Sequence, residues 1–341
     1  MRIRALVTLT VAARITAAQA PTLACEAAVP PSDSGSGRFG DVAEGSDGRL
    51  AWTDGRPGQF LLRDARGIER VVGRRGSGPG EFNSVGQLGW LGDTVWVSDG
   101  RLPRVTFFSD TGRLIRVATA MPTVSWIPRP DGRLVGIVWP QLGTMFTPWI
   151  VTSQRAGDLA RDTIKALRNP AVEHFALPPA NAMNPQPFAF RAIATSTPDG
   201  SRFCNASPDG DETRIECVDD RGRTLLETTL KLNPRPLTDA VYDSMIAVFG
   251  RGQGRTKEMV RDLIKRPRNL PPVMNIMLDN SGEIWLRRSH SYEAGSRWTR
   301  IRSNGSIRDD VEIPQRYRVM RTDGAAVWAA AADSDGLETL Y

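Results

Sequence analysis

The feature that most constrains the fold is a short pattern that recurs six times: an Asp-Gly-type turn followed by an apolar run, often with Trp. Such a turn before alternating apolar residues is the strongest local signal of a β-hairpin, because glycine adopts its positive φ without steric cost. A second glycine turn follows each of the first five copies. Each unit of about 40 residues therefore predicts four antiparallel strands, which is typical of a propeller blade. The six copies span residues 46–54, 91–99, 130–138, 198–206, 280–288 and 322–330.

We therefore predict an all-β fold, a six-bladed β-propeller of four-stranded antiparallel blades over residues 38–341. The sixth unit stops early, at Tyr341, so its blade needs an outer strand from elsewhere. We expect residues 37–51 to supply it, because an open ring would leave an unpaired sheet edge.

Two of the gaps between repeats are longer than the others and contain insertions. One insertion, at 167–188, is rich in Pro, and the other, at about 237–266, has a helical pattern. Thr238 and Thr256 stand at the N-cap positions of two short amphipathic helices. We expect their apolar stripes to pack onto the propeller; a helix that binds a partner is the alternative.

The stretch "GRRGSGPGEF" at 73–82 has the glycines of a phosphate-binding loop but not its context. Such a loop needs a helix directly after it, whose N-terminal amides hold the anion. The residues that follow, "NSVGQLGW", have no helical period and no Lys. We interpret the stretch as the connector from an outer strand to the next inner strand, with Phe82 as a plug between two blades.

This connector and the unit after it, "LGDTVWVSDGRLPRVTFFSDTGRL", resemble an NHL-type six-bladed propeller. Such units carry a Pro-Gly-Glu-Phe connector, a strand ending in Val-x-Asp and a strand ending in a glycine turn. The resemblance covers residues 73–118, and the other units keep the turn without the connector. It implies the fold more than the function, because NHL-type propellers serve as binding platforms, scaffolds and occasionally enzymes.

Cys204 and Cys217 flank a turn between two strand-like runs. If the turn centres on residues 210 and 211, the two cysteines face one another on neighbouring strands, where disulfide geometry can be met. We predict a disulfide between them, with two reduced buried thiols as the alternative.

The N-terminus predicts export. Residues 1–20 combine a positive start, a short apolar run and a small-x-small cleavage site, as in a signal peptide. Residues 21–37 then form a Pro/Ser/Gly-rich linker that we expect to be disordered. Cys25 permits an alternative, a lipid anchor, although Thr22 departs from the usual motif. No other stretch is apolar enough for a transmembrane span, so we expect a periplasmic or extracellular protein.

The formal net charge of +6 comes from arginines scattered through the chain, without a basic block. A solvated positive surface explains this pattern, and we predict no nucleic-acid partner.

Ligands of propellers bind at the mouth of the central channel, near the ends of the inner strands. We predict inner strands at 39–44, 85–91, 124–129, 190–197, 274–279 and 318–321. Their first few residues supply Asp41, Gln87, Ser125, Arg191, Asn275 and Arg318. Of these, the candidate ligand-binding side chains are Asp41, Arg191, Asn275 and Arg318. Two arginines that converge on one mouth favour an anionic ligand or partner; the alternative is that each Arg pairs with a carboxylate of its own blade.

The same positions offer too few carboxylates or histidines for a metal site, so we predict no metal and no cofactor. His174 and His290 have no partner at metal-ligand spacing, and no catalytic triad or nucleophile elbow is present. We therefore assign no catalytic residue. Trp139 and Trp149 depart from the repeat pattern and are candidates for a ligand-binding surface.

Together these features predict an exported binding or interaction module that contacts a ligand or partner at its channel mouth. The alternative is a propeller hydrolase or lyase, for example lactonase-like, with its site at the same mouth.

Overall fold

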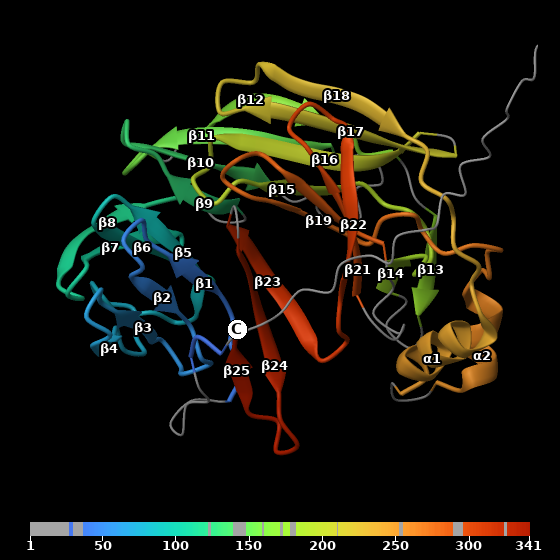
Figure 1. The fold of residues 1–341 in the computed structure, drawn as a ribbon, viewed down its shortest axis with the longest axis horizontal. Coiled ribbons are helices and arrows are strands. Elements are labelled where there is room, and N and C mark those ends of the chain that lie inside the picture. Colours follow the sequence, from blue (N-terminus) through green and yellow to red (C-terminus); the bar gives the residue numbers. More distant parts are fainter. Residues whose placement is uncertain are drawn as a thin grey trace, which may run out of the picture.

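The computed structural model describes residues 27–29, 37–121, 124–138, 148–158, 160–170, 173–177, 182–209, 211–251, 255–288, 296–323 and 326–341. They form a six-bladed β-propeller, in which six antiparallel sheets surround a central axis (Figure 1). In every blade the chain runs from the inner strand outward. The inner strands contact one another around the axis, so they form the wall of the channel. The predicted fold class is confirmed.

The strands of the first three blades, from the inner to the outer edge, are β1 (Val42–Glu44), β2 (Leu50–Trp52), β3 (Phe60–Arg63) and β4 (Glu69–Val72); β5 (Val85–Leu91), β6 (Thr94–Asp99), β7 (Arg104–Ser109) and β8 (Leu114–Thr119); β9 (Val124–Pro128), β10 (Arg133–Val138), β11 (Trp149–Arg155) and β12 (Asp162–Leu167). Those of the last three blades are β15 (Ile193–Ser196), β16 (Arg202–Asp209), β17 (Glu212–Asp219) and β18 (Thr224–Leu230); β19 (Asn275–Leu278), β20 (Ile284–Arg287), β21 (Ser296–Ile301) and β22 (Ile307–Ile313); β23 (Tyr317–Asp323), β24 (Ala326–Ala332) and β25 (Glu338–Leu340).

The repeated turns join the inner strand of a blade to its second strand. Gly48 and Gly132 occupy these turns with φ of 81° and 83°, the conformation that favours glycine. The strands after the turns carry the apolar residues of the blade cores; Trp52, for example, is buried between neighbouring strands. The repeat seen in the sequence is therefore the repeat of the blades.

The connector at 73–82 folds back on itself and contains no helix. The amide of Gly76 donates to the carbonyl of Phe82, and the amide of Phe82 donates to the carbonyl of Arg74. The ring of Phe82 is fully buried and packs against Phe60 of blade one and Phe108 of blade two, with centroid distances of 6.2 and 6.1 Å. The predicted plug between blades is confirmed.

The ring closes through residues upstream of those we expected. Strands β1 and β2 belong to blade one, and Ala28 and Val29 pair with the outermost strand of blade six. The amides of Ala28 and Leu340 donate to the carbonyls of Leu340 and Val29, respectively, at 2.8 and 2.9 Å. Within 37–51, Gly37 contributes one carbonyl to this edge, which accepts from the amide of Glu338. The physical reason is that β1 and β2 already pair with one another in blade one, where Val42, Ala43 and Leu50–Trp52 are buried.

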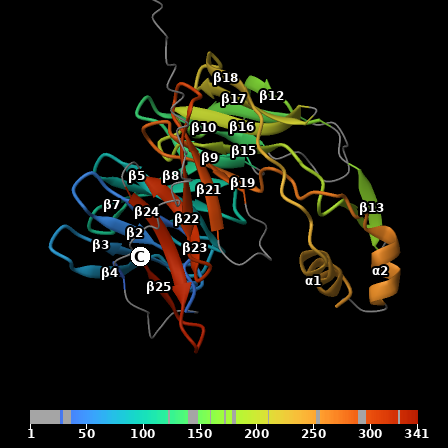
Figure 2. The ribbon, with the colours of Figure 1, turned by 45° about the vertical axis from the view of Figure 1, so that its right-hand side comes forward.

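The two insertions form one small unit beside the ring (Figures 1 and 2). It contains the hairpin β13 (His174–Leu177) and β14 (Ala182–Pro185) and the helices α1 (Asp239–Phe249) and α2 (Lys257–Leu263). The Thr238 and Thr256 hydroxyls cap the two helices as predicted.

The apolar side of these helices faces its own core. Tyr242 and Ile246 of α1 and Val260 of α2 pack with Phe175 of the hairpin and with Phe188. The expectation that the stripes pack onto the blades is thus corrected, because the two insertions bury them against one another.

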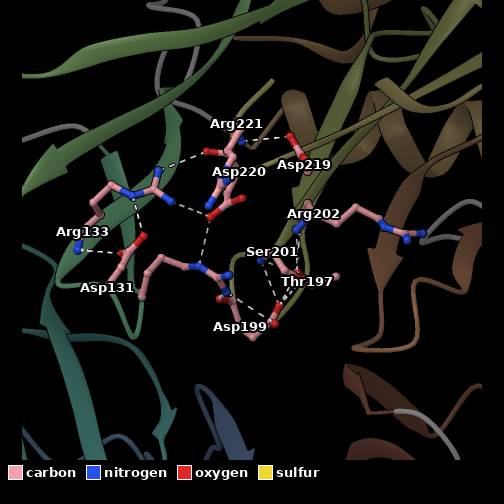
Figure 3. Close-up of polar contacts among 10 residues, drawn as sticks. Asp131, Arg133, Thr197, Asp199, Ser201, Arg202, Asp219, Asp220 and Arg221 are labelled. Atoms are coloured by element: carbon pink, nitrogen blue, oxygen red, sulfur yellow. Dashed lines mark hydrogen bonds and ion pairs between the residues drawn. The ribbon is translucent and has the colours of Figure 1, made fainter. Parts of the chain in front are cut away.

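The turn face of the propeller is tied together by ion pairs between neighbouring blades. In Figure 3, the guanidinium of Arg133 in blade three contacts Asp131 of its own turn and Asp220 of blade four, at 2.8 and 2.7 Å. Arg49 makes the equivalent link from blade one to Asp93 and Asp110 of blade two. These contacts lie on the face of the ring that carries the repeated turns.

The predicted disulfide is present. Cys204 and Cys217 face one another on β16 and β17, with their Cα atoms 4.1 Å apart, and both side chains are fully buried. The pairing of Asp209 with Glu212 places the turn where the sequence indicated it.

Candidate functional site

A large cavity lies where the inner strands of blades one to three begin, on the face opposite the ion pairs. It has a volume of about 790 Å³ and is lined by residues of all three blades, among them Thr53, Gln87, Ser98, Arg101 and Ser125. We call this cavity the vestibule. Its position follows from the fold, since the connectors between blades and the loops between second and third strands meet on this face.

A narrower cavity of about 240 Å³ continues along the axis, and we call it the channel. Its wall comes from the inner strands or their flanking residues in all six blades, including Ile127, Thr195, Asn275 and Arg321. Asp41 and Gln87 line both cavities, so the vestibule and the channel adjoin.

Asp41 and Arg321 hold the junction of three blades. The amides of Val42 and Leu88 donate to the two carboxylate oxygens of Asp41 at 2.9 and 3.0 Å. Arg321 donates through Nη1 to the carbonyls of the same two residues, at 3.0 and 3.4 Å. Blades one, two and six therefore meet at a pair of opposite charges.

Burial sets the electrostatics of this junction. It raises the pKa of the Asp41 carboxyl above its usual value, although the charge of Arg321 and the amides of Leu88 and Val42 act in the opposite direction. Among the residues that line the channel, Asp41 and Arg321 are the charged ones. The channel thus contains one fixed cation and one carboxyl whose ionised form is disfavoured.

Asp99 shapes the loop on the far side of the vestibule. Its buried carboxylate accepts hydrogen bonds from the amides of Asn83, Arg101 and Leu102 at 3.0, 2.9 and 3.1 Å. Arg104 lies 3.6 Å from the same carboxylate. The Asp of the Val-x-Asp motif therefore fixes the loop that presents the exposed Arg101 to the vestibule.

The structure brings two of the four predicted site residues to the cavities. Asp41 lines both cavities, and Asn275 lines the channel. Arg318 lines neither; it pairs with Glu338 of its own blade at 2.8 Å and donates to the carbonyl of Phe39 at 2.7 Å. Arg191 is exposed and also lies outside both linings. Arg318 thus follows the own-blade alternative.

Arg321, which the sequence did not single out, supplies the cation of the channel instead. It follows an irregularity in β23, where the pairing with β24 shifts between Val319 and Arg321. A second shift in β5, between Val85 and Leu88, places Gln87 where the two cavities join. Bulges of this kind re-aim side chains and are common beside functional sites. Strand alternation alone does not reveal them.

Two of the remaining candidates lie away from the two cavities. His174 belongs to the hairpin of the insertion unit, and Trp149 is buried in the core of blade three. His290 and Trp139 lie outside the described residues. In the described part of the chain, no group of three or more His, Cys, Asp or Glu side chains could hold a metal ion.

Comparison with known proteins supports the fold. No protein-family model matches the chain, and no curated protein matches its sequence. Among solved structures, a DUF4221-family member from Bacteroides vulgatus is similar, with a TM-score of 0.57 and 11% identity over 94% of this chain and 96% of that one. At this identity the similarity shows the fold alone.

Two further structures are more distant. A candidate exported protein from Bacteroides fragilis has a TM-score of 0.49 and 12% identity, with 92% of this chain and 93% of that chain covered. A streptogramin B lyase has a TM-score of 0.44 and 13% identity, with 91% of this chain and 85% of that chain covered.

Within the described residues, no helix has the length and apolar character that crossing a membrane requires.

Proposed function

We propose that this protein is a binding module that takes a small polar ligand into the vestibule and the adjoining channel. The observation that carries the proposal is the continuity of the two cavities, of about 790 and 240 Å³, through Asp41 and Gln87. Cavities of a few hundred Å³ with a few convergent polar groups are typical of small-molecule sites.

The lining supports a polar ligand. The vestibule is lined by Thr53, Gln87, Ser98 and Ser125, which carry hydroxyl or amide groups, and Arg101 adds an exposed cation. Asn275 continues the polar lining into the channel. Of the residues predicted to bind a ligand, Asp41 and Asn275 line the proposed site.

Asp41 also supports the alternative, a hydrolase or lyase at the same site. A carboxyl with a raised pKa inside a cavity can donate a proton to a leaving group. Turnover of δ-valerolactone by the parent and its loss in Asp41→Asn would favour the enzyme, and a turnover equal to the buffer blank would favour the binding module.

We further propose that the chain is an exported relative of NHL-type propellers. The disulfide supports export, because such bonds persist in oxidising compartments. The connector at 73–82 and its buried Phe82 support the NHL-type assignment. Mass spectrometry of protein from a bacterial periplasm should show a mature N-terminus at residue 21; a diacylglycerol adduct on Cys25 would indicate the lipid anchor instead.

Ligand-observed NMR tests the binding site. The probes are lactate, lactamide, glycerol and inorganic phosphate, each offered to the parent and to Ser125→Trp, whose indole occupies the vestibule. Thr111→Trp, in an exposed turn on the opposite face, is the matched control. We expect at least one probe to bind the parent and the control but not Ser125→Trp. Equal binding to all three proteins, or to none, would contradict the proposal.

A further inference from the structure

Arg321 is the cation of the channel, and it forms no ion pair with a carboxylate of the described residues. The arginine three residues earlier, Arg318, forms an ion pair with Glu338. Arg321 instead donates to two backbone carbonyls, and no described Asp or Glu lies within ion-pair distance of its guanidinium. Those two bonds use Nη1; Nε is buried without a partner, and Nη2 makes no hydrogen bond to a described residue. A guanidinium has five N–H donors, so Arg321 retains donors for an acceptor that the protein does not supply.

The other charged side chains near Arg321 have hydrogen-bond partners of their own. Asp41 is the other charged residue of the channel wall, and its two carboxylate oxygens accept from the amides of Val42 and Leu88. The remaining charged residues of the two cavities are Asp99, Arg101 and Arg104, all in the vestibule, where Asp99 already pairs with Arg104. The channel therefore favours a ligand that carries a negative charge.

The size and chemistry of the channel narrow the class of anion. Arg321 is one cation beside one acid, so a dianionic phosphate would meet a single compensating charge and a carboxyl that repels it. A carboxylate carries one charge and matches the planar donor geometry of a guanidinium. The neighbouring wall offers hydroxyls from Thr195 and Ser196 and apolar contacts from Met277. These suit a short organic tail better than a fully ionic group.

We propose that Arg321 binds the carboxylate of a small organic acid in the channel, which the acid reaches through the vestibule. This inference rests on the proposed function, since it names the ligand class of the same site. Asp41 modulates the binding: when its carboxyl is protonated, the repulsion of the ligand is removed and a hydrogen-bond donor is added. Binding of the acid therefore tightens as the pH falls through the raised pKa of Asp41, as long as the ligand stays ionised.

Isothermal titration with lactate and its neutral analogue lactamide tests the ligand class on the full mature chain. We expect lactate to bind the parent at least tenfold more tightly than lactamide, because a hydrogen bond to a charged group contributes about 1.5–3 kcal/mol. Arg321→Gln should lose this preference. Arg316→Gln removes the same charge from an exposed position and should bind lactate as the parent does. Circular dichroism confirms that each variant is folded.

Asp41→Asn provides a second readout that a purely structural Arg321 would not produce. We expect this variant to bind lactate more tightly than the parent at neutral pH and to lose the pH dependence. Equal affinity for lactate and lactamide, an unchanged affinity in Arg321→Gln, or tighter binding of inorganic phosphate than of lactate would each overturn the carboxylate assignment.

The two proposals fail in different ways. In one outcome, lactamide or glycerol binds, Ser125→Trp blocks this binding, and lactate binds no more tightly than lactamide. The binding module is then supported and the carboxylate site is refuted. If Arg321→Gln abolishes lactate binding while Ser125→Trp leaves it unchanged, the channel site stands and the vestibule is not its mouth. If no probe binds the parent, both are overturned.

Discussion

Phe82 allows a quantitative test of how the blades are held together. Its side chain is fully buried between blades one and two, and its ring meets Phe60 and Phe108. Truncation of a buried Phe to Ala costs about 3–5 kcal/mol, from lost burial and from the cavity that remains. We expect Phe82→Ala to fall in this range, because the connector that carries Phe82 is hydrogen-bonded to itself and cannot collapse into the gap.

This loss of stability corresponds to a decrease in the melting temperature, Tm. With an unfolding entropy of about 2.1 cal/mol/K per residue, the roughly 300 residues of the propeller (38–341) give about 0.6 kcal/mol/K, so Tm should fall by about 5–8 °C. Phe82→Leu conserves most of the volume and should lose less than about 1.5 kcal/mol. Ile115→Ala, at a side chain that is 48% exposed, is the control and should stay within about 0.5 kcal/mol of the parent.

Differential scanning calorimetry at one scan rate provides the measurement. A Tm of Phe82→Ala within about 1 °C of the parent would refute the reasoning, because a loss of 3–5 kcal/mol cannot give so small a shift. A loss in Phe82→Leu as large as in Phe82→Ala would refute it as well, since ring volume would then not be the quantity that matters.

Three further predictions concern the disulfide, the channel carboxyl and the ring closure. Replacing Cys204 and Cys217 together by Ala removes a link of sequence separation 13 and should cost about 3 kcal/mol, read from the urea midpoint; an unchanged midpoint would contradict it. Folding raises the pKa of Asp41, so its contribution to stability is fully present below the unfolded pKa and is lost as the pH rises through the folded pKa. Over that pH range the stability of Asp41→Asn should therefore rise relative to that of the parent. A difference in stability that does not change with pH would exclude a shifted carboxyl. Val29→Asp places a carboxylate where Val29 is 4% exposed and should destabilise the protein by at least about 2 kcal/mol in urea unfolding, whereas parent-like stability would show that this pairing does not close the ring.

The sequence predicted the blades because their signals are local. Each turn and the strands around it lie within a few residues of one another, and glycine marks where the backbone must take a positive φ. The inner strands follow from the same turns: β19, for example, spans Asn275–Leu278, inside the predicted 274–279. The Cys204–Cys217 pairing was also predictable, because a hairpin fixes its own register.

The parts that were missed depend on contacts between distant segments or on small irregularities. The candidates were taken from the first residues of each predicted inner strand, and Arg321 is the last residue of 318–321. Strand alternation cannot show the bulge that precedes it. The closing contact of Val29 joins the two ends of the described chain, and no local pattern announces it. The helical insertion was visible, but its partner is the other insertion, which only the fold brings beside it.

The pairing of Val29 with Leu340 has a consequence for the order of folding. Contacts within a blade are local and can form as each unit becomes available, whereas this pairing closes a loop of nearly the whole chain and bears the largest entropic cost. The ring therefore closes only after its last strand has been made, and it should also reopen first at that seam. Where cleavage is faster than reclosing, resistance to proteolysis then depends on the rate at which this pairing opens, and not on the equilibrium stability alone.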